Sequence, residues 1–322
     1  MRTSNGSIWT EGYTLTQEST PELESSLTRR RHRLVRGKRD LSAWVLVVPS
    51  LLVFVIFNWE PLISSIVLSL YETRGYSAVE FHGLRNYELI FTDSAFRAAL
   101  WNSFEYTFWS LIIGFLFPIV VAIIINEMIH LKSFFKFAVF FPTMVPTMAA
   151  SLLWLFLFHP GQGGILNGLL NVFGLGPSSW LQNSDLSIPL IVFTMTWRGF
   201  GGAVIIYLAS LQGVNHELYE AADIDGAAIR HKVRHITIPT IMPIIAILLI
   251  MQIIGVFQVM AEPLAMTDGG PNNASLSLML QSYYYAFRYF QAGRSMAVGV
   301  ITFLVLMVLN VFYFSFKKRF EG

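Results

Sequence analysis

The basic segment RRRHRLVRGKRD, residues 29–40, runs directly into an apolar stretch from Leu41 to Leu70. This stretch exceeds the roughly 20 apolar residues with which a helix crosses the hydrocarbon core of a bilayer. A basic block beside a span stays in the cytoplasm under the positive-inside rule. A nucleic-acid patch is the competing interpretation, but a position against a span favours a topological or lipid-binding role. These residues predict an integral membrane protein whose first span leaves the cytoplasm.

The composition of the whole chain agrees with a membrane protein. Of its 322 residues, 54% are hydrophobic and 13% are charged, against about 25% charged in ordinary soluble domains. The chain contains no Cys, which excludes disulfide frameworks and thiolate zinc sites. Five further apolar runs follow the first one, at Phe104–Met128, Phe134–Phe158, Ile188–Gln212, Thr240–Leu264 and Met296–Phe316. We therefore expect an all-α membrane protein with six transmembrane helices, kinked where Pro falls within the runs.

The distribution of Lys and Arg indicates the orientation of the six spans. With both termini inside, 16 of the 22 basic residues fall in predicted cytoplasmic segments and five in outer loops, while Arg198 lies within a span. This excess is the signal of the positive-inside rule. We therefore predict a polar, then basic, cytoplasmic tail (1–40), a six-span membrane domain (41–316) and a basic cytoplasmic C-terminus (317–322).

The predicted inner loop between the fourth and fifth spans, residues 214–239, is the most informative stretch outside the membrane. Its first half is acidic, its second half is basic, and small residues lie between them. We expect a helix over Glu217–Ala222, a turn at Gly226 and a second helix over Ala227–Ile236. Small side chains allow another protein to approach closely, so the loop is a candidate docking site. A solvated amphipathic loop is the alternative.

Residues of this loop resemble a known signature. Glu220-Ala221-Ala222, then Asp225-Gly226-Ala227, then Ile238-Pro239 with Pro243, are similar to the EAA motif of permease subunits in bacterial binding-protein-dependent ABC importers. In that family the motif forms a cytoplasmic coupling helix that seats in a separate ATPase. The resemblance implies the coupling residues Glu220, Ala221, Ala222, Asp223, Asp225, Gly226 and Ala227. Asp223 departs mildly from the pattern, because Ala or Ser often follows the EAA triplet.

Two further segments narrow the resemblance to the maltose-type carbohydrate branch. Gly83-Leu84-Arg85-Asn86-Tyr87 is similar to the GLxNY segment between its first two spans. Thr267-Asp268-Gly269-Gly270-Pro271 is similar to its outer-loop TxGGP segment. The second segment looks more like the first permease of the usual heterodimeric pair than the second. The resemblance extends over about residues 42 to 319, nearly the whole chain apart from its tail.

The resemblance implies a permease subunit that imports a carbohydrate by alternating access, in the bacterial inner membrane and in contact with its lipid. It also implies a second homologous permease, two copies of a cytoplasmic ATPase and an extracytoplasmic solute-binding protein. ATP and Mg²⁺ would be used by the ATPase, because this chain lacks the G-x-x-x-x-G-K-[ST] loop. We expect no nucleic-acid partner, no bound cofactor or metal and no catalytic residue. His231 and His235 have the i, i+4 spacing of metal ligands, but we interpret them as part of the basic loop end.

The substrate path is predicted by the distance of span residues from these motifs. The candidates are Trp197, Arg198, Gly199, Gly202, Gln252 and Gln258. An aromatic ring, amides and a guanidinium suit a sugar, which is bound by stacking and hydrogen bonds.

Arg198 is the sharpest indication of the substrate, because an Arg at the centre of a span costs roughly 2.5–3.5 kcal/mol on insertion scales. One hypothesis is an anionic saccharide, such as a uronic acid oligomer like alginate, bound by a guanidinium–carboxylate pair. The alternative is a pair between Arg198 and a protein acid: Asp185, Glu262 or an acid of a partner subunit.

Three other functions stay open on the residues. Acids at the span edges, Glu60, Glu105 and Glu262, are compatible with a proton-coupled secondary sugar transporter, although structural capping suits their positions better. An integral-membrane enzyme acting on glycan precursors would need paired carboxylates, and the longest outer loop contains only Asp185. Polyol and sugar-phosphate ABC permeases share the motifs quoted above.

Overall fold

The computed structural model describes residues 44–45, 47–161 and 163–320. The predicted cytoplasmic tail, 1–40, lies outside these residues. The chain divides into two units, Met1–Ile63 and Ser64–Gly322. Helices make up most of the described chain, which confirms the all-α fold class.

Within the described residues, five helical segments are long and apolar enough to cross a membrane, and a bent pair of helices makes up to a sixth. The five segments are Val47–Leu68, Ser94–Glu127, Ser184–Leu211, Ile229–Phe257 and Ala292–Ser315. The elements within them are η1 (Val55–Trp59), α2 (Glu60–Leu68), α4 (Ser94–Trp109), η2 (Ser110–Phe115), α5 (Leu116–Glu127), α9 (Ser184–Leu211), α11 (Ile229–Lys232), η5 (Val233–Thr237), α12 (Ile238–Phe257) and α15 (Ala292–Phe320). Each segment overlaps one predicted apolar run.

Two of the prolines predicted to kink the spans, Pro61 and Pro118, follow π-helical turns, and so does Pro239. Three of the spanning segments contain one such turn, η1, η2 and η5. Each turn ends two or three residues before a proline: Pro61, Pro118 and Pro239 respectively. Proline lacks an N–H and its ring clashes with the carbonyl four residues earlier, so a wider turn at this place relieves the clash.

The third span is bent much more sharply than the apolar run Phe134–Phe158 predicted. It consists of α6 (Lys132–Phe140), η3 (Phe141–Met144) and α7 (Thr147–Leu157), and its two halves meet at 98°. The break lies at Val145, which is extended (ψ 127°) because the following Pro146 disfavours helical backbone at the residue before it.

The fifth span ends earlier than the predicted run Thr240–Leu264. Its helix stops at Phe257, and α13 (Ala261–Met266) follows as a separate short helix. Pro263 explains the break, because it is tolerated in the first turn of α13 but would remove a hydrogen bond from a continuous helix. The second span begins earlier than predicted, at Ser94, because the Asp93 side chain accepts a hydrogen bond of 2.9 Å from the Ala95 N–H and caps the helix.

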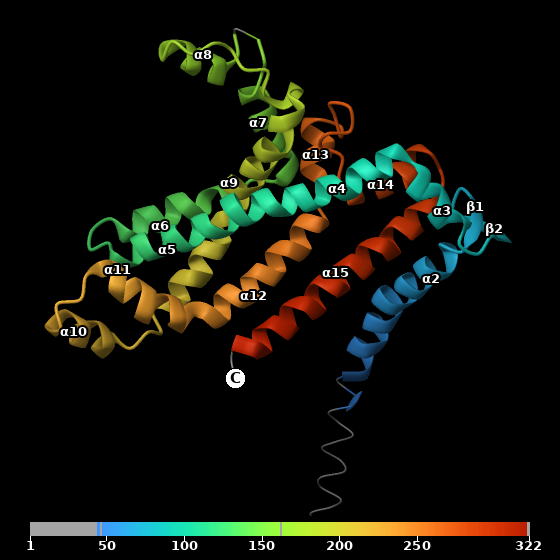
Figure 1. The fold of residues 1–322 in the computed structure, drawn as a ribbon. Coiled ribbons are helices and arrows are strands. Elements are labelled where there is room, and N and C mark those ends of the chain that lie inside the picture. The colour runs from blue at the N-terminus through green and yellow to red at the C-terminus, as the bar shows by residue number, and fades with distance from the viewer. Residues whose placement is uncertain (1–43, 46, 162, 321–322) are drawn as a thin grey trace, which may run out of the picture. The chain divides into compact units, whose positions relative to one another are not determined.

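Short elements connect the spans (Figure 1). They are the antiparallel strands β1 (Tyr71–Arg74) and β2 (Ser77–Phe81), α3 (Arg85–Thr92), α8 (Ile165–Val172), η4 (Trp180–Gln182), α10 (His216–Ile224), α14 (Leu278–Tyr283) and η6 (Tyr284–Arg288). The β-hairpin is an addition to the purely helical prediction. Figure 1 shows α10 and α11 together at the end where α12 begins, with α8 next to α7.

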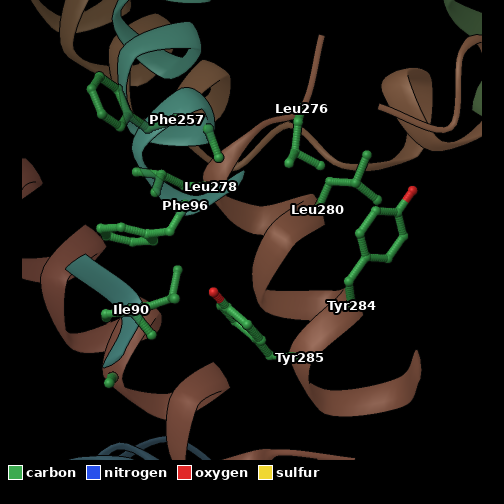
Figure 2. Close-up of a cluster of buried hydrophobic side chains, with 11 residues drawn as sticks. Ile90, Phe96, Phe257, Leu276, Leu278, Leu280, Tyr284 and Tyr285 are labelled. Atoms are coloured by element: carbon green, nitrogen blue, oxygen red, sulfur yellow. The ribbon is translucent and has the colours of Figure 1, made fainter. Parts of the chain in front are cut away.

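A buried hydrophobic cluster joins residues that are far apart in the chain (Figure 2). Ile90 of α3 and Phe96 of α4 pack in it with Phe257 at the end of α12 and Leu278 of α14. All four side chains are fully buried. The cluster therefore holds α3, α4, α12 and α14 in one arrangement and positions the loop between α13 and α14.

Candidate functional site

A cavity of about 210 Å³ lies among η2, α9, α12 and the start of α13. Most of its wall is apolar, but several polar side chains face it. Its lining residues are Ser110, Gly114, Val192, Met195, Thr196, Arg198, Gly199, Phe200, Ala203, Met251, Gln252, Gly255, Val256 and Glu262. A mostly apolar cavity with a few polar groups is the usual form of a small-molecule site.

Arg198 and Glu262 form an ion pair at this cavity. The Arg198 Nη2 lies 3.8 Å from the Glu262 Oε1, and the two side chains are 29% and 9% exposed. The buried Arg198 Nε has no hydrogen-bond partner among the described residues. This geometry supports the alternative in which Arg198 pairs with a protein acid.

A polar contact crosses the cavity at Gly114. The Gln252 Nε2 of α12 donates a hydrogen bond to the Ser110 Oγ of η2. A Cβ at Gly114 would lie 2.9 Å from the Gln252 Nε2 and 3.0 Å from the Thr196 Oγ1, so the absence of a side chain at this position lets the three polar groups meet. The π-turn η2 places Ser110 and Gly114 on the same side of the span. A second cavity of about 140 Å³ shares Gly114 and Gln252.

The structure brings together three of the six predicted substrate-path residues. Arg198, Gly199 and Gln252 line the cavity, whereas Trp197, Gly202 and Gln258 are not in its lining. The Trp197 ring packs edge-on against Trp154 of α7, with centroids 5.7 Å apart. Gln258 is the exposed C-cap residue of α12.

Sequence reasoning did not select Ser110, Gly114 and Thr196, which also line the cavity. Ser110 and Gly114 are four residues apart within a long apolar run, and this interruption is the signal that could have identified them. The Gly-rich stretch of α9 has a further packing role. A Cβ at Gly201 would lie 2.3 Å from the Val139 carbonyl oxygen, so Gly201 allows α6 to lie directly against α9.

A larger cavity of about 570 Å³ lies between α7, η4 and the loop after α13. Its lining consists mainly of Leu, Phe and Pro side chains and includes no Asp, Glu, Lys or Arg. It also contains the polar side chains of His159, Ser179, Gln182 and Thr267. The smaller cavity includes an ion pair and three of the predicted substrate-path residues, so it is the better candidate for a sugar.

The loop between α9 and α12 has the helix and turn expected from the sequence. Asn215 caps α10, its Oδ1 accepting a hydrogen bond of 3.1 Å from the Glu217 N–H. At the other end, Gly226 is left-handed (φ 71°), the Ala227 N–H donates to the Ala222 carbonyl at 2.9 Å and the Gly226 N–H donates to the Asp223 carbonyl at 3.1 Å. These two bonds make a Schellman motif that ends the helix.

Two side-chain contacts connect the two halves of the loop, and the tip of the loop is exposed. The Lys232 Nζ lies 2.6 Å from the Asp223 Oδ1, and the Tyr219 hydroxyl lies 2.9 Å from the Thr237 hydroxyl. Ile224, at the C-terminal end of α10, is 88% exposed. The loop therefore combines a defined backbone with an exposed apolar tip, which suits docking of another protein.

The predicted coupling residues lie close to this tip. Glu220, Ala221, Asp223, Asp225 and Gly226 are exposed, and Ala222 and Ala227 are half-buried. The Glu220 carboxylate lies 3.3 Å from the His216 Nδ1 on the same helix face.

The two loop histidines stack on each other. The His231 and His235 rings have centroids 4.3 Å apart, and the described residues contain no group of three His, Cys, Asp or Glu that could hold a metal ion.

The GLRNY segment serves as a structural anchor. The Asn86 Nδ2 donates to the carbonyls of Ser69 at 2.9 Å and Tyr71 at 2.8 Å. The Tyr87 hydroxyl lies 2.8 Å from the Ser69 hydroxyl. These bonds tie α3 to the end of α2 and to β1.

The TDGGP segment begins the loop between α13 and α14, residues 267–277, which is called the TDGGP loop below. Hydrogen bonds join this loop to the second span. The Asn102 Nδ2 donates to the carbonyls of Asn273 at 2.7 Å and Leu276 at 2.9 Å, and the Tyr106 hydroxyl donates to the Ser275 carbonyl at 2.8 Å. These three hydrogen bonds hold the loop against α4.

The exposed side of the same loop carries a charged contact. Arg288 donates to Asp268 at 2.7 Å and 2.9 Å, and the Tyr284 hydroxyl donates to Asp268 at 2.5 Å. Burial alone would raise the pKa of Asp268, but the hydrogen bonds from Tyr284 and Arg288 and the Arg288 charge lower it below its ordinary value.

Comparison with known proteins identifies the family to which this chain belongs. The family model described as binding-protein-dependent transport system inner membrane component matches residues 114–322. The arabinooligosaccharides transport system permease protein AraP of Bacillus subtilis (strain 168) is 32% identical over 294 residues, which cover 89% of this chain and 93% of that protein. The lactose transport system permease protein LacF of Rhizobium radiobacter is 31% identical over 287 residues, covering 88% and 95% respectively.

A solved structure has the same fold. It is that of a bacterial ABC transporter involved in the import of the acidic polysaccharide alginate, with a TM-score of 0.80 and 24% identity, covering 90% of this chain and 100% of that chain. The sequence matches extend over most of the chain, including the cavity and the loop between α9 and α12. The chain belongs to the family of inner membrane components of binding-protein-dependent transport systems.

Proposed function

We propose that this protein is the permease subunit of an ATP-driven ABC importer that moves a carbohydrate into the cytoplasm by alternating access. Family membership supports the transport role, and relatives named for arabinooligosaccharides and lactose support a carbohydrate cargo. The observation that carries the proposal is the polar cavity within the apolar spans. Ser110, Thr196, Gln252 and Arg198 supply hydrogen-bonding groups there, as a hydroxylated substrate requires.

Energy enters through the loop between α9 and α12 in this proposal. Glu220, Ala221, Ala222, Asp223, Asp225, Gly226 and Ala227 form the contact with a separate ATPase, which binds ATP and Mg²⁺. The Schellman turn and the Lys232–Asp223 pair support this role, because they give the loop the defined backbone that transmits a displacement to α9 and α12. The permease itself has no catalytic residue.

The assembly contains a second homologous permease, two copies of the ATPase and an extracytoplasmic solute-binding protein. The match to binding-protein-dependent systems supports these partners. The excess of Lys and Arg in the terminal segments and in the loops at 132–136 and 230–234 supports an orientation with both termini and the coupling loop in the cytoplasm.

Uptake by the complete transporter reconstituted in proteoliposomes tests the proposal. We expect uptake of labelled oligosaccharide that requires ATP on the coupling-loop side and persists when an ionophore abolishes the proton gradient. Glu220→Lys should reduce uptake strongly, because it reverses a charge on the exposed loop. Uptake that the ionophore abolishes and that continues without ATP would instead indicate a proton-coupled secondary transporter.

A further inference from the structure

Two opposite charges lie at the cavity among η2, α9, α12 and α13. Of the described residues that line it, Arg198 and Glu262 are the charged ones. They come from different elements, the middle of α9 and the first turn of α13. Their separation of 3.8 Å allows each charge to compensate the other, but it exceeds the roughly 2.7–2.9 Å of a charge-assisted hydrogen bond.

We propose that Glu262 determines the charge selectivity of this cavity: by neutralising Arg198 it makes the permease select uncharged saccharides and reject uronic acid oligomers. This inference rests on the proposed function, in which the cavity contacts the transported carbohydrate. It assigns the selection to the acid of the pair, a residue outside the predicted substrate path.

The long ion pair leaves Arg198 able to bind a neutral sugar. The Arg198 side chain is 29% exposed and meets Glu262 through Nη2, and the guanidinium has five N–H donors. Sugar hydroxyls accept hydrogen bonds from such donors without disturbing the charge balance. A uronate carboxylate would have to enter beside the Glu262 carboxylate, and this like-charge contact disfavours the wrong ligand.

The surrounding structure holds Glu262 in place. The Thr267 hydroxyl donates to the Pro263 carbonyl at 3.0 Å and lies 2.7 Å from the Ser275 hydroxyl. Ser275 is in turn bound by Tyr106 of the second span. The TDGGP loop thus anchors the backbone of α13 next to Glu262, which keeps the acid at the cavity beside Arg198.

Direct binding to the assembled transporter in lipid nanodiscs tests this selectivity without the solute-binding protein. The probes are trigalacturonate and a neutral panel of arabinotriose, lactose and maltose. In Glu262→Gln, the affinity for trigalacturonate relative to the best neutral sugar should rise by at least about tenfold, because an unpaired guanidinium forms a charge-assisted bond with a carboxylate. Asp185→Asn, which removes an exposed acid in the first turn of α9, is the matched control and should leave the ratio unchanged.

The double variant Arg198→Gln/Glu262→Gln guards against a folding defect of the single one. It contains no uncompensated charge, so it should assemble and keep the neutral preference. The inference is overturned by an unchanged ratio in assembled Glu262→Gln, by a wild type that prefers trigalacturonate, or by a double variant that fails to assemble or accepts the anion. A wild type that neither binds nor imports any saccharide contradicts the proposed function itself, whereas the first three results leave saccharide import standing.

Discussion

The Lys232 ammonium lies 2.6 Å from the Asp223 carboxylate across the turn at Gly226. Lys232 is 19% exposed and Asp223 is 63% exposed, so solvent screens the pair and its contribution to stability is about 0.2–1 kcal/mol. We predict that Asp223→Asn leaves the thermal stability of the protein nearly unchanged but lowers uptake per ATP hydrolysed. Parallel measurement of ATP hydrolysis and uptake checks this, with Glu127→Gln as control, since Glu127 lies outside the loop.

Gly226→Val should uncouple transport more strongly than Gly226→Ala. Both side chains are strained at φ 71°, because left-handed backbone costs an L residue about 1–2 kcal/mol and a β-branched residue suffers most. We expect ATP hydrolysis to continue while uptake falls. Gly213→Ala, where φ is not positive, should retain uptake. Equal uptake in Gly226→Val and Gly213→Ala would show that the turn is not needed for coupling.

Gly114→Ala should weaken substrate binding. The new methyl group would lie 2.9 Å from the Gln252 Nε2, so Gln252 must move and its hydrogen bond to Ser110 is lost. We predict a rise in the KM for uptake with little change in the amount of folded protein. Gly299→Ala in α15 places its methyl group in open space and serves as the control. An unchanged KM in Gly114→Ala would remove this contact from the substrate path.

Asn102→Ala should destabilise the TDGGP loop. Asn102 is buried and bonds two loop carbonyls, and leaving buried polar groups unpaired costs about 1–3 kcal/mol. Thermal unfolding in detergent should show a clear loss. Asn310→Ala, which removes one bond to a carbonyl already within helix α15, should change the melting temperature much less. Similar losses in both variants would contradict a special role for Asn102.

The pH dependence of stability should contain a contribution from Asp268. Its pKa is lowered in the folded protein, so the contribution is present above the pKa of the unfolded chain and is lost as the pH falls through the lower folded value. The side chain is 52% exposed, which makes the effect small. Melting temperatures of wild type and Asp268→Asn should therefore differ at neutral pH and converge in acid. A difference that grows in acid would contradict this assignment.

Local sequence signals predicted the spans and the coupling turn well. Apolar length alone was sufficient for the six runs, and Gly226 after a short helical stretch was sufficient for the left-handed helix end. The prolines of the third run predicted a kink but not a bend of 98° at Val145, and the separate helix containing Pro263 was not predicted. Hydrophobicity does not distinguish a straight helix from two helices joined at a proline, because both bury the same apolar residues.

The sequence by itself determined the membrane class, the six apolar runs and the family, because these depend on composition and on residues close together in the chain. The tertiary structure decided that Gln252 meets Ser110 over Gly114 and that Glu262 is the partner of Arg198. Asp185, Glu262 and an acid of a partner subunit were the possible partners from the sequence. The choice among them depends on how α9 and α13 pack. That packing is set by the hydrogen-bonded TDGGP loop and by the bond from Tyr106 of the second span to Ser275, residues that are 169 positions apart in the chain.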